Sequence, residues 1–314
     1  MTPAPPRGDS HGVPGRVGGR APGRWLDGGV PEGDSVYKLA RRLDRRLRGQ
    51  RVVRTDLRVP RLATRDLSGR TLLEHATYGK HLLTRFDAGP PDGVDPVPVT
   101  LHSHLLMDGE WSVTGPGKRL PTRLMTEVRV VLETTGGTGW GRRLHQLDLV
   151  RTRDEDRLVG HLGPDPLRGD WDAAEAVRRL AGDRDRPLVT ALLDQTRMAG
   201  LGNLWANELA FLTGVSPWTP VRGVDLVRLV DRAALALRHS ATVEGAYQVT
   251  TGLGTRGETH WVSGRQRRPC LRCGTEVRMV AELENDPGNR RTWWCPHCQP
   301  GPGPESRRRS TGSW

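Results

Sequence analysis

Two pairs of cysteines constrain this chain more than any other feature. They are the only cysteines in 314 residues, and both pairs have C-x2-C spacing: Cys270 with Cys273, and Cys295 with Cys298. A thiolate pair at that spacing spans one edge of a zinc tetrahedron, and two pairs complete it. Because four thiolates leave no position for water or substrate, the sequence predicts one structural Zn2+ ion. Two disulfides are the alternative, but a large chain without a secretory hydrophobic segment favours a reducing compartment and a metal.

The segment between the two pairs indicates a β-hairpin. It is 21 residues long and ends in Asn289-Arg290-Arg291-Thr292-Trp293-Trp294, which would make the hairpin cationic and aromatic. This spacer is slightly longer than the usual range of roughly 15 to 20 residues, so residues 282–288 are interpreted as a longer loop at the hairpin tip.

The charge balance favours a polyanionic partner. The formal net charge is +12, and nucleic acid is the commonest polyanion in a bacterial cytoplasm. No apolar run approaches the length of a membrane span, so we expect a cytoplasmic, nucleoid-associated protein without a membrane partner. The alternative is that the arginine reflects GC-rich coding, since the chain is also rich in Gly and Pro and lacks Ile.

Hydrophobic periodicity divides the chain into successive parts. Residues 1–29 and the tail from Gln299, including 301–314, are Gly, Pro and Arg rich and predict disorder. A helix capped by Asp34 or Ser35 would bury a stripe of Val36, Leu39, Ala40, Leu43 and Leu47. Short runs with turn signals then predict a β-sandwich or barrel, with strands at 51–56, 70–78, 81–85, 99–106, 127–134 and 144–149. Helical periods follow at 171–180, 187–194, 203–212 and 224–243.

A glycine-rich turn, Met198-Ala199-Gly200-Leu201-Gly202-Asn203, precedes the third of these helices. Glycines let backbone N–H groups approach an anion at a helix N-terminus, with Asn203 as the cap, although an ordinary helix–helix turn is the alternative.

Five motifs in sequence order resemble the formamidopyrimidine-DNA glycosylase / endonuclease VIII family. They are Pro31-Glu32-Gly33, His104-Leu105-x-Met107-x-Gly109, the linker 162–167, Leu192-Leu193-Asp194-Gln195 followed by 200–208, and Gly264-Arg265-x3-Pro269-Cys270 continuing through Arg290 to Gln299. One match could be chance, but five in order are implausible as coincidence.

The resemblance implies an α+β multidomain fold. Its parts would be an N-terminal catalytic β-sandwich with flanking helices (30–165), a helix-two-turn-helix domain (170–250) and a zinc-finger β-hairpin (260–300). Double-stranded DNA carrying a damaged base or an abasic site would bind in the cleft between the two halves of a monomer. Zinc is the one cofactor implied, with no nucleotide or redox group.

The resemblance assigns the nucleophile to Pro31 and the general acid/base to Glu32. A proline inside a chain is an amide without a usable lone pair, so Pro31 requires translation to begin at a GUG codon read as Val30. We therefore expect residues 1–30 to be a misassigned gene start. A free α-amino group titrates near 7.7–8.0, so a large fraction is neutral at pH 7. The alternative is that Pro-Glu only marks a helix start.

The resemblance places three further residues on DNA. Lys80, one of only three lysines, corresponds to a catalytic lysine that binds the phosphate near the lesion and assists elimination. Arg290 would clamp phosphate from the zinc hairpin, with a solvated surface charge as the alternative. Met107 corresponds to the wedge that fills the gap left by the extruded base, with a core methionine as an equal alternative. Asn203 is expected at the DNA surface, whereas His102 and His104 are interpreted as structural.

The predicted function is a bifunctional DNA glycosylase/AP lyase of base-excision repair, acting through a Schiff base and β/δ-elimination. Purine-selective members share an Asp-x-Arg-x-Phe-Gly stretch, and the corresponding residues 147–153 lack the aromatic residue. This difference and the start Pro31-Glu32-Gly33-Asp34 favour the endonuclease VIII branch and oxidised pyrimidines. The alternatives are an oxidised-purine glycosylase, or a DNA-binding protein that recognises lesions without cutting if the extension is retained.

Overall fold

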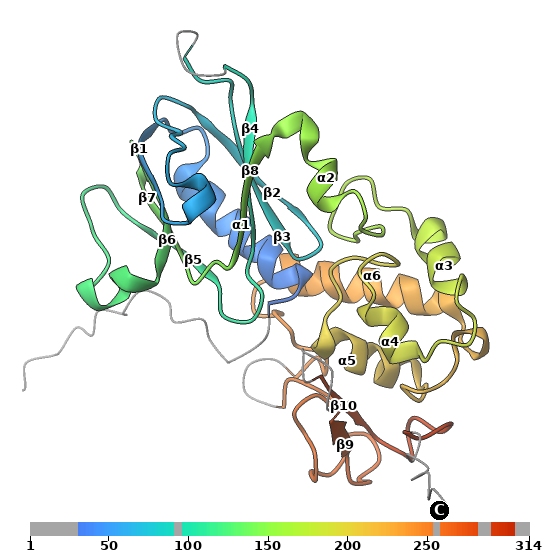
Figure 1. Ribbon diagram of the computed structural model, residues 1–314. Helices are drawn as coiled ribbons and strands as arrows, with labels where there is room; N and C mark the ends of the chain where they lie inside the picture. The colour runs from blue at the N-terminus through green and yellow to red at the C-terminus, as the bar shows by residue number, and fades with distance from the viewer. Residues whose placement is uncertain (1–30, 91–95, 254–257, 282–289, 305–314) are drawn as a thin grey trace, which may run out of the picture.

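The computed structural model describes residues 31–90, 96–253, 258–281 and 290–304. The predictions of disorder for 1–29 and 305–314, and of a loop at 282–288, lie outside these residues. Figure 1 shows a β-rich part, a helical part beside it and a small hairpin below the helices. Within the described ranges, no helix is long and apolar enough to cross a membrane.

The first helix, α1 (Gly33–Leu47), begins earlier than predicted. Its expected apolar stripe is confirmed, because all five side chains are buried. The predicted cap at Asp34 or Ser35 is wrong: the N-cap is Glu32, whose backbone N–H donates to the Ser35 hydroxyl over 2.8 Å. The Ser35 hydroxyl in turn donates to the Glu32 carbonyl oxygen over 2.7 Å, which closes the first turn.

Two antiparallel four-stranded sheets form the predicted sandwich. One has the order β1-β6-β7-β5, with bounds Val52–Leu57, Val128–Thr134, Gly137–Arg142 and Glu110–Thr114. The other has the order β2-β3-β4-β8, with bounds Leu72–Tyr78, His81–Phe86, Val99–His104 and Gln146–Arg151. The buried face of α1 joins the core between the sheets, together with Leu82, Leu101, Trp111 and Leu132. Helix α1 therefore completes the sandwich rather than lying outside it.

Strands β5 and β7 were not predicted. Strand β7 reads GTGWGR, and glycine weakens strand propensity. Here glycine is needed because core side chains pack directly against the strand backbone. A Cβ on Gly141 would lie 2.6 Å from Leu144 Cδ1 and 3.2 Å from the Trp111 ring. Tertiary packing thus overrides the local preference.

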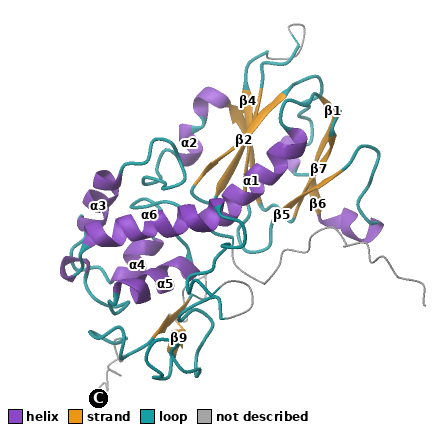
Figure 2. Ribbon diagram, turned by 180° about the vertical axis from the view of Figure 1, so that it is seen from behind, coloured by secondary structure: helices purple, strands orange, loops and turns teal. Residues whose placement is uncertain are grey.

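The helical part follows a short helix, α2 (Asp156–Val159). The four predicted helices are confirmed as α3 (Ala173–Ala181), α4 (Leu188–Leu193), α5 (Asn203–Thr213) and α6 (Leu226–Thr242). They enclose a second core that includes Leu192, Trp205, Leu209, Leu229 and Leu237. Short 3-10 turns occur at Pro60–Leu62, Thr122–Glu127, Thr152–Asp154 and Val221–Gly223. As Figure 2 shows, α1 and the long α6 lie end to end along one side of the molecule.

The predicted hairpin consists of β9 (Arg278–Ala281) and β10 (Arg291–Trp294), paired antiparallel. The chain beyond it is more ordered than the sequence indicated. Gln299 is buried and its amide donates to the Val215 carbonyl over 3.0 Å, and the Ser216 hydroxyl donates to the Pro302 carbonyl. Order therefore continues past Gln299, because these residues pack against the turn after α5.

Candidate functional site at the junction of the sandwich and the helices

The glycine-rich turn before α5 binds an anionic group, as expected, but that group belongs to the protein itself. It is the carboxylate of Glu32. Backbone N–H groups of Gly202 and Leu204 donate to its two oxygens over 2.7 and 2.8 Å, and Trp205 N–H lies at 3.4 Å. The unpaired N–H groups of a first helical turn stabilise negative charge. The glycine turn thus holds an internal carboxylate, and the N-cap of α5 is Gly202 rather than Asn203.

Glycines make this contact possible. A Cβ on Gly202 would lie 2.4 Å from Glu32 Cδ, and a Cβ on Gly33 would lie 2.8 Å from the backbone of Gly200. Gly33 N–H donates to the Gly200 carbonyl over 2.8 Å, and Gly200 has a φ of +95°. The start of α1 and the turn before α5 are therefore in direct backbone contact, which fixes Glu32 between them.

Burial raises the pKa of Glu32 to about 7. The nearby Lys80 ammonium and the backbone N–H groups oppose that rise, whereas the Asp34 carboxylate adds to it. At neutral pH both protonation states of Glu32 are accessible, which suits a group that must donate and later accept a proton.

Lys80 lies on the tight turn between β2 and β3. Gly79, with φ +54°, donates its N–H to Asp165 over 2.8 Å and packs against the backbone of Gly200. Burial lowers the pKa of Lys80, Glu32 raises it and Arg290 lowers it further. The structure therefore brings Glu32, Lys80 and Arg290, far apart in sequence, into one electrostatic neighbourhood.

Pro31 is half-buried and immediately precedes Glu32, so it lies at the same corner. In the 314-residue chain its nitrogen is bonded to the carbonyl carbon of Val30.

Asp34 belongs to a buried network that sequence reasoning missed. Its carboxylate accepts from the Ser240 hydroxyl over 2.5 Å and from the Trp205 indole N–H over 3.2 Å. Gln248 N–H donates to the same Ser240 hydroxyl over 2.8 Å. Burial raises the pKa of Asp34, and these donors oppose the rise. No local pattern indicates this network, because it joins α1 to α6 across about two thirds of the chain.

Met107 lies at the tip of the loop between β4 and β5. Its exposed fraction of 65% excludes the core alternative. The neighbouring Leu106 is also exposed and has a φ of 51°, a region that non-glycine residues rarely occupy. The loop is closed by Gly109 N–H donating to the Leu105 carbonyl over 2.8 Å. Two apolar side chains are thus presented outward on a tight turn.

Asn203 connects α5 to the hairpin. Its side-chain amide donates to the Arg291 carbonyl over 2.9 Å, and Trp293 N–H donates to the Asn207 side-chain oxygen over 2.8 Å. Helix α5 therefore positions both Glu32, at its start, and the strand that follows Arg290.

The four cysteines gather at the base of the hairpin. Their Sγ atoms all lie within 4.8 Å of one another, with Cys270 to Cys298 at 3.9 Å and Cys273 to Cys295 at 3.5 Å. A tetrahedral ion with metal–sulfur bonds of about 2.3 Å needs sulfurs roughly 3.8 Å apart. The geometry therefore fits a four-thiolate metal site, and the cysteines are free thiols rather than the alternative disulfides.

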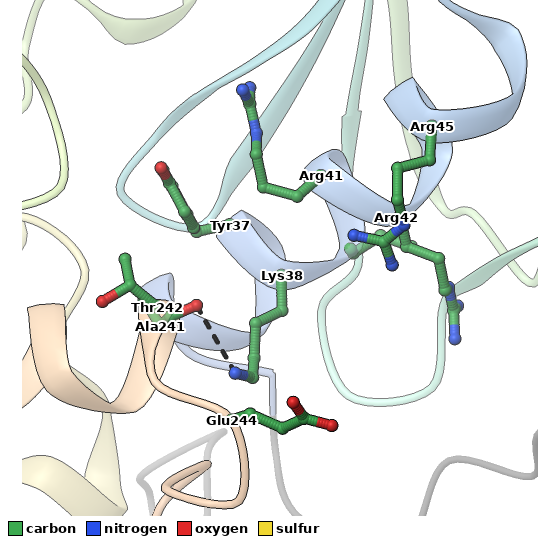
Figure 3. Close-up of a pocket in the computed structure, with 9 residues that line it drawn as sticks. Tyr37, Lys38, Arg41, Arg42, Arg45, Ala241, Thr242 and Glu244 are labelled. Atoms are coloured by element: carbon green, nitrogen blue, oxygen red, sulfur yellow. Dashed lines mark hydrogen bonds between the residues drawn. The ribbon is translucent and has the colours of Figure 1, made fainter.

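A pocket of about 610 Å³ lies elsewhere, between α1 and the end of α6 (Figure 3). Its lining includes Tyr37, Lys38, Arg41, Arg45 and Glu244, and Lys38 donates to the Ala241 carbonyl over 3.4 Å. None of the predicted site residues lines it.

Two family models match consecutive parts of the chain. The formamidopyrimidine-DNA glycosylase N-terminal domain matches residues 30–163, and the formamidopyrimidine-DNA glycosylase H2TH domain matches residues 162–245. The fold is thus that of a DNA glycosylase with a helix-two-turn-helix domain. The chain belongs to the formamidopyrimidine-DNA glycosylase / endonuclease VIII family.

This chain aligns with curated relatives over almost the whole length of each relative. A protein of Streptomyces coelicolor named "Probable endonuclease 8 2" is 47% identical over 276 residues, covering 88% of this chain and 96% of the relative. A protein of Mycolicibacterium smegmatis named "DNA-(apurinic or apyrimidinic site) lyase Nei2" is 41% identical, covering 86% of this chain and 99% of the relative.

Solved structures show the same fold. Lactococcus lactis Fpg (MutM) in complex with DNA containing N7-benzyl-Fapy-dG superposes with a TM-score of 0.68 at 23% identity, covering 86% of this chain and all of that one. The Lactococcus lactis Fpg complex with DNA containing an abasic site gives a TM-score of 0.68 at 22% identity, with the same coverage.

Proposed function

We propose that this protein is a bifunctional DNA glycosylase and AP lyase that acts on double-stranded DNA containing a damaged base or an abasic site. The observation that carries the proposal is the corner where Glu32 is buried at the start of α5, next to Pro31 and within the field of Lys80. A buried carboxyl with a pKa near neutrality beside a cation is typical of a catalytic site.

The reaction begins with a free Pro31 nitrogen. Its lone pair attacks C1′ of the deoxyribose, the C1′–N bond to the base breaks, and the base leaves with that electron pair and takes up a proton. Opening of the sugar ring gives an iminium between Pro31 and C1′. This route requires the chain to begin at Pro31, because an amide nitrogen has no usable lone pair.

Glu32 is proposed to move the protons of this sequence. Protonated Glu32 donates to the sugar ring oxygen as the ring opens. The resulting carboxylate then helps remove a proton from C2′, which the iminium acidifies, and the C3′–O bond breaks to release the 3′ phosphate (β-elimination). Loss of the 5′ phosphate completes δ-elimination.

The remaining site residues are proposed to hold the DNA. Lys80 and Arg290 bind backbone phosphates near the lesion, where a guanidinium offers a bidentate grip. Met107 inserts where the nucleotide is extruded, since an exposed unbranched side chain suits that gap. Asn203 lies at the DNA surface and braces the hairpin that carries Arg290.

Oxidised pyrimidines are the proposed substrates. The relatives named endonuclease 8 support this assignment. Residues 147–153 form part of β8 and its end, and they contain no aromatic residue that could lie opposite an oxidised purine. An oxidised-purine activity is the competing assignment, and cleavage of matched duplexes with either lesion separates the two.

We further propose that the metal is one structural Zn2+ held by the four cysteine thiolates. Zinc fits the donor set and supplies rigidity to the hairpin rather than chemistry. The proposed division is a catalytic domain at 30–165, a helix-two-turn-helix domain at 170–250 and a zinc finger at 260–300. The protein is further proposed to act as a monomer in the bacterial cytoplasm.

Borohydride trapping tests the proposal. The protein beginning at Pro31 should form a covalent adduct with a duplex bearing an abasic site, because borohydride reduces the iminium to a stable amine. The 314-residue form, in which Pro31 is an amide, should bind the duplex without trapping. Binding without trapping in both forms would exclude the enzyme and leave a second function, recognition of lesions without cutting.

A further inference from the structure

A row of histidines lies on the outer face of the β2-β3-β4-β8 sheet. His81 pairs with His104 across β3 and β4, and their rings are 4.7 Å apart. His102 is two residues before His104 and therefore shares its face, with its ring 5.1 Å from that of His81. His161, from the loop after α2, approaches the His81 ring at 6.4 Å.

The sheet face that carries this histidine row is the one that packs against the helical part. Leu83, which pairs with His102, packs against Val159, Leu162 and Ala199 rather than into the sandwich core. Lys80 immediately precedes His81, and the loop that carries Met107 follows His104. The row thus lies between Lys80 and the Met107 loop, the two groups proposed to contact DNA.

Hydrogen bonds orient the row from one end. Arg61 Nη1 lies 2.9 Å from Asp148 Oδ1, and Asp148 Oδ2 lies 3.3 Å from His102 Nδ1. His102 Nε2 lies 2.8 Å from His81 Nδ1. Because a carboxylate only accepts, His102 carries its hydrogen on Nδ1 and accepts at Nε2, so His81 donates from Nδ1. The remaining position, His81 Nε2, is therefore an unprotonated acceptor.

The surroundings keep this position neutral in the free protein. Burial, together with the neighbouring His104, His102, His161 and Lys80, lowers the pKa of His81 to about 3. Burial and Lys80 likewise lower the pKa of His104 to about 4. The charged and titratable groups that face His81 from its neighbours are Lys80, His102, His104, His161, Asp148 and, beyond them, Arg61, Tyr78 and Arg168.

We propose that His81 is a further DNA-phosphate ligand and that docking of the DNA backbone is coupled to uptake of one proton at His81 Nε2. The proton comes from solvent, and the new N–H donates to a phosphodiester oxygen. The bonds to His102 and Asp148 stay as they are, and Asp148 balances the added charge through the chain. The inference rests on the proposed function, because it requires DNA in this cleft.

Linkage fixes the sign of the pH dependence. A phosphate anion beside His81 raises its pKa in the complex above that in the free protein. The complex then binds more protons than the free protein, so affinity increases as the pH falls, by at most about tenfold per pH unit for one proton.

The test uses the protein beginning at Pro31 and a duplex with an uncleavable tetrahydrofuran abasic analogue. Dissociation constants are measured from pH 5.5 to 8.0, and proton uptake is measured by calorimetry in two buffers of different ionisation enthalpy. The wild type should bind several-fold tighter at pH 5.5 and take up protons. In His81→Asn the amide can still donate to His102 but does not titrate, so the pH dependence and the uptake should both be lost.

Two further variants locate the proton. His104→Asn should retain the uptake. Asp148→Asn can donate to His102 Nδ1, which reverses the chain and leaves a permanent hydrogen on His81 Nε2, so affinity should become independent of pH. Nitrogen-15 shifts of the His81 ring should report that change of tautomer.

Uptake that persists in His81→Asn, or that disappears only in His104→Asn, would overturn the inference. Tight binding of the wild type without proton uptake would do the same while leaving the proposed function intact. Failure to bind the abasic duplex at any pH would instead count against the proposed function itself.

Discussion

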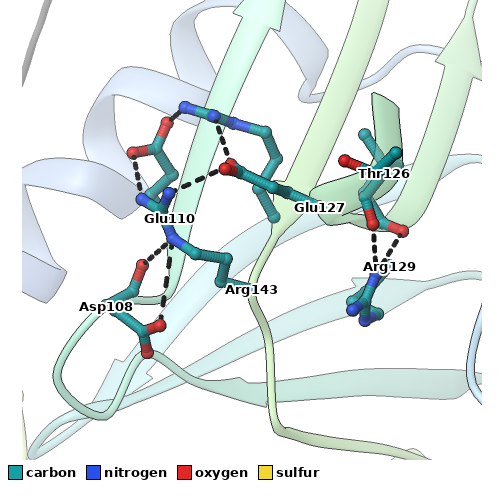
Figure 4. A network of polar contacts seen from close by, with 8 residues as sticks. Asp108, Glu110, Thr126, Glu127, Arg129 and Arg143 are labelled. Atoms are coloured by element: carbon teal, nitrogen blue, oxygen red, sulfur yellow. Dashed lines mark hydrogen bonds and ion pairs between the residues drawn. The ribbon is translucent and has the colours of Figure 1, made fainter. Parts of the chain in front are cut away.

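Two clusters of acidic side chains differ in the groups that bind their carboxylates. One cluster lies on one sheet of the sandwich, and the other lies at the start of α1. On the β1-β6-β7-β5 sheet, Arg142 and Arg143 pair with Glu110 and Glu127, and Arg143 also reaches Asp108 (Figure 4). Each carboxylate there faces guanidinium groups. At the corner beneath α1, Glu32 and Asp34 are instead held by backbone N–H, indole and hydroxyl donors.

The difference separates a structural cluster from the one proposed to be catalytic. Neutral donors satisfy a carboxylate's hydrogen bonds without fully offsetting the loss of hydration, so burial raises the pKa of Glu32 to about 7. Opposite charges, by contrast, stabilise the ionised form of a carboxyl. A carboxyl held by dipoles rather than cations can therefore exchange a proton near neutral pH, at a cost in stability that a purely structural cluster avoids.

Glu32→Gln should give the largest change. Loss of the proton-transferring group is expected to lower the rate of strand cleavage by about 10²- to 10⁴-fold. The new amide NH2 must also face a backbone N–H donor, which should cost about 1–3 kcal/mol in the free energy of unfolding. Single-turnover cleavage and urea unfolding measure the two effects.

Glu127→Gln is the matched control in the ion-pair cluster. It should leave cleavage unchanged and alter stability by no more than about 1 kcal/mol, because partly exposed ion pairs contribute little. Equal losses of activity in the two variants would remove the distinction between the clusters.

Removal of the metal should abolish DNA binding while leaving the sandwich folded. The hairpin core around Val262, Val277 and Cys295 is separate from the sandwich core, so loss of the four-thiolate site should free only the hairpin. Binding to an abasic-analogue duplex and near-ultraviolet circular dichroism after chelation measure this. Unchanged affinity would show that the hairpin does not contact DNA.

Gly202→Ala should displace the Glu32 carboxylate. The added methyl group would lie 2.4 Å from Glu32 Cδ, so the start of α1 must shift, with an expected cost of about 1–3 kcal/mol and a clear loss of activity. Gly115→Ala is the control, since a Cβ there meets nothing within 4 Å. Similar behaviour of the two variants would mean that the contact between the glycine turn and Glu32 has little consequence.

Arg290→Ala should have the smallest effect. It should weaken binding to every duplex alike and reduce the salt dependence by about one phosphate contact. Arg54→Ala, on the exposed side of β1, should change neither. A loss confined to one DNA sequence would contradict the phosphate role.

Much of the fold follows from the sequence because it depends on local signals. The α1 stripe, the four helices and the two C-x2-C pairs are patterns of period and spacing, and the structure confirms them. Strand β7 was missed because its glycines are required by close contacts with Trp111 of β5 and with Leu144.

The candidate site divides in the same way. The sequence motifs indicated Glu32, Lys80 and the glycine turn as separate features, but only the structure shows that the turn binds Glu32. Nor could spacing show that Met107 is exposed, or that Asp34 bonds Ser240 across 206 positions. Such contacts depend on how distant segments pack.

The central claim is that the Pro31 nitrogen forms the covalent bond to the sugar, and peptide mapping of the borohydride-trapped complex tests it most directly. Lys80 is the competing amine, because burial lowers its pKa and it lies in the same neighbourhood. Tandem mass spectrometry should place the reduced sugar adduct on the peptide that begins at Pro31. An adduct on Lys80, or trapping by a form in which Pro31 is still preceded by Val30, would contradict the account.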